Sequence, residues 1–211
     1  MEREMEQVNE LETGTTTVGL TIGSGVILAA DKRATMGHLK ASDEAQKVFE
    51  LDDTLGITIA GSVGDAQKLI RFMRSELKKR KLETRELSVN GAATLLANVL
   101  QGSKMMPFMN QFIMGGTDRD GKAVFDLDPL GGRMEQSQFT STGSGSRTAY
   151  GVLEDAYEED MTIDEGIGIA VRAVAAASER DVASGDGIDV AKITDAGFER
   201  LDPDDVDEYM D

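Results

Sequence analysis

The sequence predicts an α+β fold in which antiparallel sheets are covered by helices. β-branched, apolar runs gather at the start and in the middle of the chain, amphipathic helical patterns come in pairs, and strands and helices do not alternate one by one. Segregation of this kind is typical of layered α+β folds rather than of repeated βαβ units. The chain has 211 residues, three prolines and neither a repeat nor a linker, so we expect a single domain.

The strands are predicted from short β-branched and apolar runs bounded by turn residues. A Ser-Gly step between the first two runs indicates a tight turn, and Asp-Arg-Asp-Gly at 118–121 is a turn signal between two later runs. The expected strands span residues 15–23, 25–31, 55–61, 110–117, 122–128, 134–140 and 188–194.

The helices are predicted from apolar residues that recur at three- and four-residue spacing. Ser62 is placed to cap the first of them, whose last turn is basic. Thr162 and Glu165 have the spacing of a capping box at the start of the last one. The expected helices span residues 62–80, 88–101, 146–159 and 163–180.

The composition excludes several classes of function. The chain has no Cys and one His, which rules out disulfides, a cysteine nucleophile, a thiolate metal site and a multi-histidine metal site. Its 39 acidic and 22 basic residues give a net charge of −17, which argues against a broad nucleic-acid surface. No segment approaches the roughly 18 apolar residues of a membrane span, and the first residues lack the apolar core of a secretory signal. We therefore expect a cytoplasmic protein without a membrane or nucleic-acid partner.

Much of the negative charge lies at the two ends of the chain. Residues 1–14 hold five Glu and one Arg, and residues 202–211 hold six acidic residues and no basic one, so ten of the seventeen net negative charges lie there. The protein is either an ordinary acidic one with charged ends or one from a host with a salty cytoplasm, where surface carboxylates maintain solubility. The distribution supports the salty host less strongly than the total charge does.

The most informative segment is the junction of Gly14 and Thr15. A Thr hydroxyl is a weak nucleophile without a neighbouring base. The α-amine of a Thr that has become N-terminal can act as that base, because its pKa of about 7.7–8.0 lies near neutral pH. Cleavage after Gly14 would create this amine, and a residue without Cβ allows Thr15 Oγ1 to reach the preceding carbonyl. The alternative is that a Thr-rich run merely begins a strand.

Further short motifs follow in order along the chain. They are Gly-Thr-Thr-Thr-Val-Gly at 14–19, Ala-Asp-Lys-Arg-Ala-Thr at 30–35, Lys-Val-Phe at 47–49, Ala-Gly-Ser-Val-Gly-Asp-Ala at 60–66, Gly-Ser-Gly-Ser at 143–146 and Arg-Asp-Val-Ala-Ser-Gly at 180–185. Together they resemble the catalytic β subunit of archaeal-type 20S proteasomes, over essentially all of residues 14–200.

The resemblance implies the N-terminal nucleophile hydrolase fold, a four-layer α/β/β/α sandwich. It also implies a division of the chain into three parts. Residues 1–14 would be a propeptide removed by autocleavage between Gly14 and Thr15. Residues 15–201 would form the catalytic domain, and residues 202–211 an acidic C-terminal tail.

The resemblance further implies a role for each of several residues. Thr15 would be the nucleophile through Oγ1 and the base through its free α-amine, while Lys47 would lower the pKa of both groups and Asp31 would hold Lys47 charged and oriented. The N–H of Gly61 would stabilise the oxyanion, and Thr35 and Gly61 would pair with the substrate backbone. The residues that would position the amine are Ser144, Asp181 and Ser184.

A substrate pocket beside Thr15 is implied as well. The residues that the resemblance assigns to its lining are mostly apolar, with no charge among them, which favours cleavage after large hydrophobic residues over acidic ones. The residues expected to line this S1 pocket are Ala34, Ala45, Phe49, Ile59, Val63 and Gln67.

Each of these motifs has an ordinary structural interpretation when it is taken alone. An Asp-Lys-Arg run is typical of a solvated turn, a single lysine of an exposed loop, and short Ser-containing runs of helix ends. Their occurrence together in one frame favours catalysis. Gly-Ser-Gly at 143–145 lacks the phosphate-binding and dinucleotide-binding patterns. His38 is expected in a surface loop, and the methionines in core or subunit contacts, namely Met105, Met106, Met109 and Met114.

The resemblance implies a large assembly that degrades unfolded proteins. Rings of seven β subunits would stack between rings of α subunits, with an ATPase ring to unfold substrates and with no metal or organic cofactor. Two alternatives are a non-catalytic ring subunit and a bacterial-type relative with simpler rings. The joint presence of Thr15, Asp31, Lys47 and Gly61 argues against the first, and the archaeal character of the motifs argues against the second.

Overall fold

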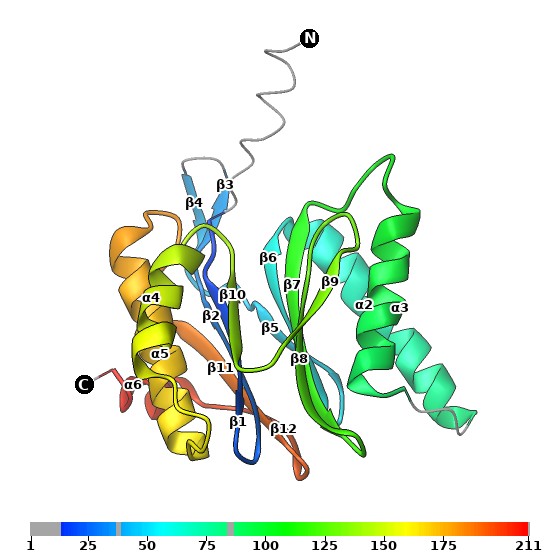
Figure 1. Cartoon of the computed structure of the whole chain (residues 1–211). Helices are drawn as coiled ribbons and strands as arrows, with labels where there is room; N and C mark the ends of the chain where they lie inside the picture. The colour runs from blue at the N-terminus through cyan, green and yellow to red at the C-terminus, as the bar shows by residue number, and fades with distance from the viewer. Residues whose placement is uncertain (1–13, 37–38, 84–86, 211) are drawn as a thin grey trace.

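The computed structural model describes residues 14–36, 39–83 and 87–210. In this part of the chain, two five-stranded antiparallel sheets face each other (Figure 1). The first sheet has the strand order β10-β1-β2-β11-β12, and the second has the order β5-β6-β7-β8-β9. A short hairpin, β3-β4, follows β2 and stands beside the first sheet (Figure 1).

The elements have the following bounds. The first sheet consists of β1 (Thr17–Ile22), β2 (Gly25–Asp31), β10 (Phe139–Thr142), β11 (Ile188–Thr194) and β12 (Gly197–Arg200). The second consists of β5 (Val48–Asp52), β6 (Leu55–Gly61), β7 (Asn110–Asp118), β8 (Gly121–Leu127) and β9 (Arg133–Gln136), and the hairpin of β3 (Ala34–Met36) and β4 (Leu39–Ser42). The helices are α2 (Val63–Leu82), α3 (Val89–Gly102), α4 (Ser146–Ala156), α5 (Ile163–Arg180) and α6 (Pro203–Asp207).

The helices lie on the outer faces of the two sheets (Figure 1). Helices α4 and α5 pack on the first sheet, and α2 and α3 pack on the second. Between the sheets, apolar side chains of both form a separate core cluster that includes Leu28, Ile113 and Ile193. The layers are therefore ordered helix, sheet, sheet, helix, and the mixture of helices with antiparallel sheets confirms the predicted α+β class.

The continuous apolar run of β2, residues 26–30, follows from the central place of this strand in the first sheet. Every residue of β2 and of its neighbour β1 is buried, because helix α5 covers one face and the second sheet covers the other. A strand buried on both faces loses the alternation of polar and apolar residues that a half-exposed strand shows. This explains the unbroken apolar run of β2, whereas β1 keeps buried Thr17 and Thr21 in alternation with its apolar residues.

The predicted helix starts are confirmed by the capping contacts. The Ser62 side chain accepts a hydrogen bond from the Asp65 N–H at 3.4 Å at the start of α2. Thr162 and Glu165 form both bonds of a capping box, since the Thr162 N–H donates to Glu165 at 2.9 Å and the Glu165 N–H donates to the Thr162 hydroxyl at 3.3 Å. Each cap satisfies N–H groups that lack partners in the first turn of a helix.

Several predicted boundaries were wrong. The single strand expected at 134–140 is two strands, because β9 pairs with β8 in the second sheet whereas β10 pairs with β1 in the first. The chain crosses between sheets at residues 137–138, a change of partner that side-chain periodicity does not encode. The third predicted helix ends at Ala156 rather than at residue 159. The short elements β3, β4, β5, β12 and α6 were not predicted.

Within the described part of the chain, no helix is both long enough and apolar enough to cross a bilayer.

Candidate active site

The start of β1, the end of β2 and the start of β5 meet at one end of the sheets. The antiparallel register of β1 and β2 places Thr17 opposite Ala30, so the residues before β1 lie beside Asp31. The Asp31 N–H donates to the Thr16 carbonyl at 3.1 Å. Lys47 immediately precedes β5 and reaches this point from the second sheet. Residues 15, 31 and 47 are thus brought together by both sheets.

The side chains of Thr15, Asp31 and Lys47 form a buried chain of contacts. Lys47 Nζ donates to Thr15 Oγ1 at 3.0 Å and to Asp31 Oδ1 at 2.9 Å. Thr15 is 3%, Lys47 5% and Asp31 0% exposed. A hydroxyl that accepts a bond from an ammonium group loses its proton more readily, because the positive charge favours the oxyanion.

Asp31 is held by backbone donors as well as by Lys47. The Thr16 N–H donates to Oδ1 at 2.8 Å, and the N–H groups of Gly185 and Arg33 donate to Oδ2 at 2.9 and 3.1 Å. A buried carboxylate is tolerated only when its lone pairs are satisfied in this way. The carboxylate therefore has a fixed orientation and fixes the ammonium group next to it.

Burial lowers the pKa of the Lys47 ammonium group from its ordinary value, and the neighbouring Asp31 carboxylate opposes this shift. A lysine with a lowered pKa gives up its proton more readily than one in solvent. The arrangement is of the kind found around activated nucleophiles, where burial and a specific charge partner act on one group.

A second set of hydrogen bonds reaches the backbone nitrogen of Thr15. That N–H donates to Ser144 Oγ at 3.2 Å, and the hydroxyls of Ser144 and Ser184 both donate to Asp181 Oδ2, the latter at 2.8 Å. Ser184 Oγ also lies 2.8 Å from Thr16 Oγ1. The structure therefore brings Ser144, Asp181 and Ser184 together around the nitrogen of Thr15.

The carbonyl of Gly14 lies beside the hydroxyl of Thr15. Thr15 Oγ1 donates to the Gly14 carbonyl oxygen at 2.6 Å. A Cβ on Gly14 would lie 1.6 Å from the Cβ of Ala183, so a side chain does not fit at this position. The close approach of the two segments therefore requires glycine.

Gly61 and Thr35 both line the cavity that opens beside Thr15. Gly61 has a φ of +134°, and a Cβ there would lie 2.1 Å from the Met109 carbonyl oxygen. A side chain would therefore be strained as well as crowded at the last residue of β6. Thr35 Oγ1 is buried and has no hydrogen-bond partner among the described residues. An unsatisfied hydroxyl of this kind is free to bond a ligand.

A cavity of about 270 Å³ opens beside Thr15. All six residues expected for the S1 pocket line it, together with Thr15, Lys47, Thr35 and Gly61. It is also lined by Arg33 and Gln46, which the sequence analysis did not assign. The Arg33 guanidinium is directed to Asp186 Oδ2, which its Nε reaches at 2.7 Å, and to the Val182 carbonyl. The Asp-Lys-Arg run was the only sequence signal for Arg33.

A family model described as "Proteasome subunit" matches residues 11–193. The chain belongs to this proteasome family. It is similar to "Proteasome subunit beta" of Methanohalophilus mahii, with 49% identity over 93% of this chain and 94% of the relative. The protein of the same name from Methanococcoides burtonii is 51% identical over 90% of this chain and 91% of its own. That of Methanocaldococcus vulcanius is 50% identical over 93% and 89%. The likeness therefore extends over nearly the whole length of both chains.

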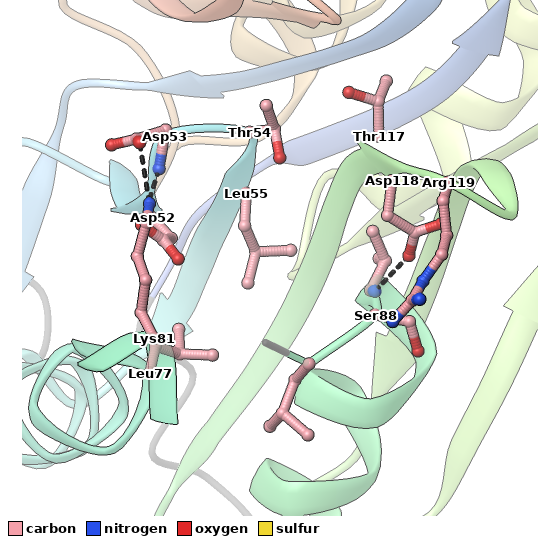
Figure 2. Close-up of a pocket in the computed structure, with 12 residues that line it drawn as sticks. Asp52, Asp53, Thr54, Leu55, Leu77, Lys81, Ser88, Thr117, Asp118 and Arg119 are labelled. Carbon is pink, nitrogen blue, oxygen red and sulfur yellow. Dashed lines mark hydrogen bonds and ion pairs between the residues drawn. The ribbon is translucent and has the colours of Figure 1, made fainter. Parts of the chain in front are cut away.

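This proteasome-family chain has a larger cavity, of about 820 Å³, at the ends of β5 and β6 that lie away from Thr15. Figure 2 shows that its walls come from the β5-β6 and β7-β8 turns and from α2 and α3. Lys81 is paired there with Asp52 and Asp53, and Asp118 accepts the Val89 N–H at 2.6 Å. These charged groups form ion pairs with one another or accept hydrogen bonds from the backbone. Size alone therefore does not identify the functional cavity.

The structure describes only some of the other predicted positions. Residues 1–13, with most of the expected propeptide, and His38 lie outside the described residues. Met114 is fully buried, whereas Met105 and Met106 are 96% and 86% exposed and Met109 is partly exposed. Met114 thus packs in the core, whereas for the other three a subunit contact stays a prediction. No cluster of three or more potential metal ligands occurs within the described residues.

Proposed function

We propose that the chain is the catalytic β subunit of a 20S proteasome core particle, a threonine endopeptidase that processes itself. The observation that carries the proposal is the 3.0 Å contact between Lys47 Nζ and Thr15 Oγ1 beside a cavity of substrate size. The 47–51% identity to proteasome β subunits supports the same assignment. On this assignment, the layered arrangement is the four-layer α/β/β/α sandwich of N-terminal nucleophile hydrolases.

The first reaction is removal of residues 1–14. Thr15 Oγ1 attacks the carbonyl carbon of Gly14, and its proton passes to the nitrogen of Thr15 as the Gly14–Thr15 amide bond breaks. The product is an ester between Gly14 and Thr15 Oγ1, with a free α-amine on Thr15. Water hydrolyses the ester and releases the propeptide with a new carboxyl group. The 2.6 Å contact between the hydroxyl and the Gly14 carbonyl supports this step, since the reacting groups are already adjacent.

The second reaction is hydrolysis of substrate peptides at the same hydroxyl. The free α-amine of Thr15 takes the proton of Oγ1 as the oxygen attacks the scissile carbonyl, and it returns the proton to the leaving amine. Lys47 lowers the pKa of both Thr15 groups by its charge, and the Gly61 N–H stabilises the oxyanion. Water then cleaves the acyl-enzyme ester. Ser144, Asp181 and Ser184 orient the amine through the hydrogen bonds that now reach the Thr15 nitrogen.

The substrate is an extended peptide with a large hydrophobic residue before the cleaved bond. Apolar side chains of Ala34, Ala45 and Ile59 line the cavity, and the backbone of Thr35 and Gly61 can pair with a peptide strand along its edge. Measured turnover that is higher after Glu than after Leu, Phe or Tyr would contradict this preference.

The subunit acts in an assembled particle in the cytoplasm. Seven β subunits form a ring, rings of α subunits flank the β rings, and an ATPase ring delivers unfolded proteins. Every catalytic role is filled by protein groups, so no metal or organic cofactor takes part. The contacts among Thr15, Asp31 and Lys47 favour this function over that of a non-catalytic ring subunit, in which such contacts serve no purpose.

The intact mass of the chain after assembly with α subunits tests the proposal. We expect the mass to correspond to loss of residues 1–14, together with hydrolysis of a fluorogenic peptide that ends in a hydrophobic residue. Thr15→Ala removes the nucleophile of both reactions, so it should abolish processing by the subunit itself and peptide hydrolysis while the particle still assembles. A full-length 211-residue chain in an assembled particle that is inactive on peptides would falsify the proposal.

A further inference from the structure

Val48, the residue after Lys47, begins a strand at the edge of the second sheet. β5 pairs with β6, and the Lys47 carbonyl accepts the Ile59 N–H at 3.0 Å on that side. Successive backbone groups of a strand alternate in direction, so the N–H and C=O of Val48 point away from β6. Val48 is fully buried, and buried backbone groups require hydrogen-bond partners.

An ion pair from the first sheet supplies those partners. Asp189 on β11 accepts the Val48 N–H at 3.2 Å through Oδ2, and Arg200 on β12 donates to the Val48 carbonyl through Nη2. Arg200 Nη1 lies 3.4 Å from Asp189 Oδ1. The carboxylate is 4% exposed and the guanidinium 36% exposed. The pair therefore contacts both outward backbone groups of Val48, whose carbonyl also accepts Gln46 Nε2 at 2.9 Å. It joins β5 of the second sheet to β11 and β12 of the first.

The contacts of Asp189 and Arg200 with Val48, here called the bridge, lie directly after Lys47 in the chain. They therefore bear on the position of the lysine side chain. A lysine side chain has four rotatable bonds, so the position of Nζ depends on how firmly its Cα is held. The peptide group between Lys47 and Val48 is bound on both sides, because its carbonyl accepts from β6 and its N–H donates to Asp189. Arg200 binds the carbonyl of the following peptide group. Nζ then lies within 3.0 Å of both Thr15 Oγ1 and Asp31 Oδ1.

We infer that Asp189 and Arg200 are positioning residues for Lys47, and that they act through the backbone of Val48 without contacting substrate. The inference rests on the proposed function, because it assigns the bridge a part in the same reaction. Without the bridge, the start of β5 would keep its bonds to β6 and to Gln46 but would be held less firmly to the first sheet, which carries Thr15. The ammonium group would then spend less time beside the nucleophile.

Asp189→Asn tests the inference in the assembled particle. The amide keeps the size of the side chain but removes the charge that pairs with Arg200. We expect kcat for a hydrophobic fluorogenic peptide to fall about tenfold, since a displacement near 1 Å can cost about a hundredfold. The acid limb of the kcat/KM profile should move to higher pH, because a more distant Lys47 lowers the pKa of the Thr15 amine less. KM should change little.

A matched control separates positioning from general stability. Asp126 on β8 is a half-buried carboxylate that accepts Gln136 Nε2 at 2.9 Å in the second sheet, so Asp126→Asn is a comparable change outside the site. We expect it to leave kcat and the pH profile unchanged. Should Asp189→Asn fail to assemble, Arg200→Gln removes the other half of the bridge at a partly exposed position and should give the same shift.

A crystal structure of the Asp189→Asn particle provides a measurement that does not depend on turnover. We expect the distance from Lys47 Nζ to Thr15 Oγ1 to lengthen relative to the wild type. An unchanged distance, or a pH profile identical to that of the wild type, overturns the inference. Lack of peptide hydrolysis in the wild type would instead contradict the proposed function, so the two failures are distinguishable.

Discussion

Gly14 packs against Ala183 so closely that a Cβ on Gly14 would lie 1.6 Å from the Ala183 Cβ. The loop that contains Ala183 also carries Asp181 and Ser184, which belong to the hydrogen-bond network around the Thr15 nitrogen. The Gly14–Thr15 bond, at which we propose autocleavage, is therefore pressed against the loop that would orient the new amine of Thr15. The absence of a side chain at residue 14 is a requirement of packing as well as of chain flexibility.

Gly14→Ala should slow self-processing while leaving the processed enzyme unaffected. The new methyl group must displace either residue 14 or the loop, and it moves the carbonyl away from Thr15 Oγ1. We expect the rate of propeptide loss, followed by intact mass during assembly, to fall about tenfold or more. The control is a chain produced with Thr15 as its first residue, which should hydrolyse peptides normally. Processing of Gly14→Ala at the wild-type rate would contradict this view of the junction.

Asp31→Asn should damage both stability and activity. The substitution leaves Lys47 as a buried charge without its anionic partner, and breaking a buried pair in this way costs about 3–5 kcal/mol. Chemical denaturation of the isolated subunit gives the change in the free energy of unfolding, and peptide hydrolysis by the particle gives the loss of kcat. The control Asp53→Asn breaks an exposed pair with Lys81 and should change neither. Equal effects of the two substitutions would contradict the assigned importance of burial.

The ion pairs of Asp186 with Arg33 and Lys40 should make the stability of the folded protein sensitive to acid. Arg33 Nε at 2.7 Å and Lys40 Nζ at 3.0 Å lower the pKa of Asp186 to about 2, mainly through the Arg33 hydrogen bond. An unfolded Asp has a pKa of about 3.9, so this carboxylate stabilises the folded state above that pH. The contribution is lost as the pH falls through about 2. Asp186 has a φ of +63°, which Asn also tolerates.

Asp186→Asn provides the measurement. We expect a lower Tm than the wild type at pH 7, and a difference that shrinks as the pH is lowered from about 4 toward 2, where the wild-type carboxylate takes up its proton. A difference that stays constant over this range would show that the ion pairs contribute nothing to it.

The predictions from sequence were most successful where the signal is local. The period of apolar residues identified helices α2, α3, α4 and α5, and the caps at Ser62 and Thr162 marked two of their starts. The break between β9 and β10 was missed because it depends on which sheet each strand joins, and that choice is made by tertiary contacts. The short edge strand β12 has too few residues to show a period.

The candidate active site could likewise be predicted only as far as local sequence signals allow. Thr15, Asp31 and Lys47 were selected as part of a recognised set of motifs, and spacing along the chain gave no measure of their separation in space. Their 2.9–3.0 Å contacts depend on the register of β1 with β2 and on the approach of β5 from the other sheet. The bridge from Asp189 and Arg200 to Val48 had no distinguishing sequence signal, since an Asp inside an apolar strand can face solvent as readily as a buried backbone group.

The lining of the cavity beside Thr15 should determine which residue precedes the cleaved bond. Ala45 lines this cavity with a small, uncharged side chain at a partly exposed position. Ala45→Arg would introduce a cation that fills part of the space and attracts a carboxylate. We expect kcat/KM to fall at least tenfold for peptides cleaved after Leu or Phe, and to rise relative to them for peptides cleaved after Glu, because such charge contacts discriminate strongly in a partly dry pocket. Ala45→Val narrows the same space without charge and should reduce cleavage after Phe more than after Leu. If Ala45→Arg leaves the ratio of Glu to Leu cleavage unchanged, the specificity pocket lies elsewhere.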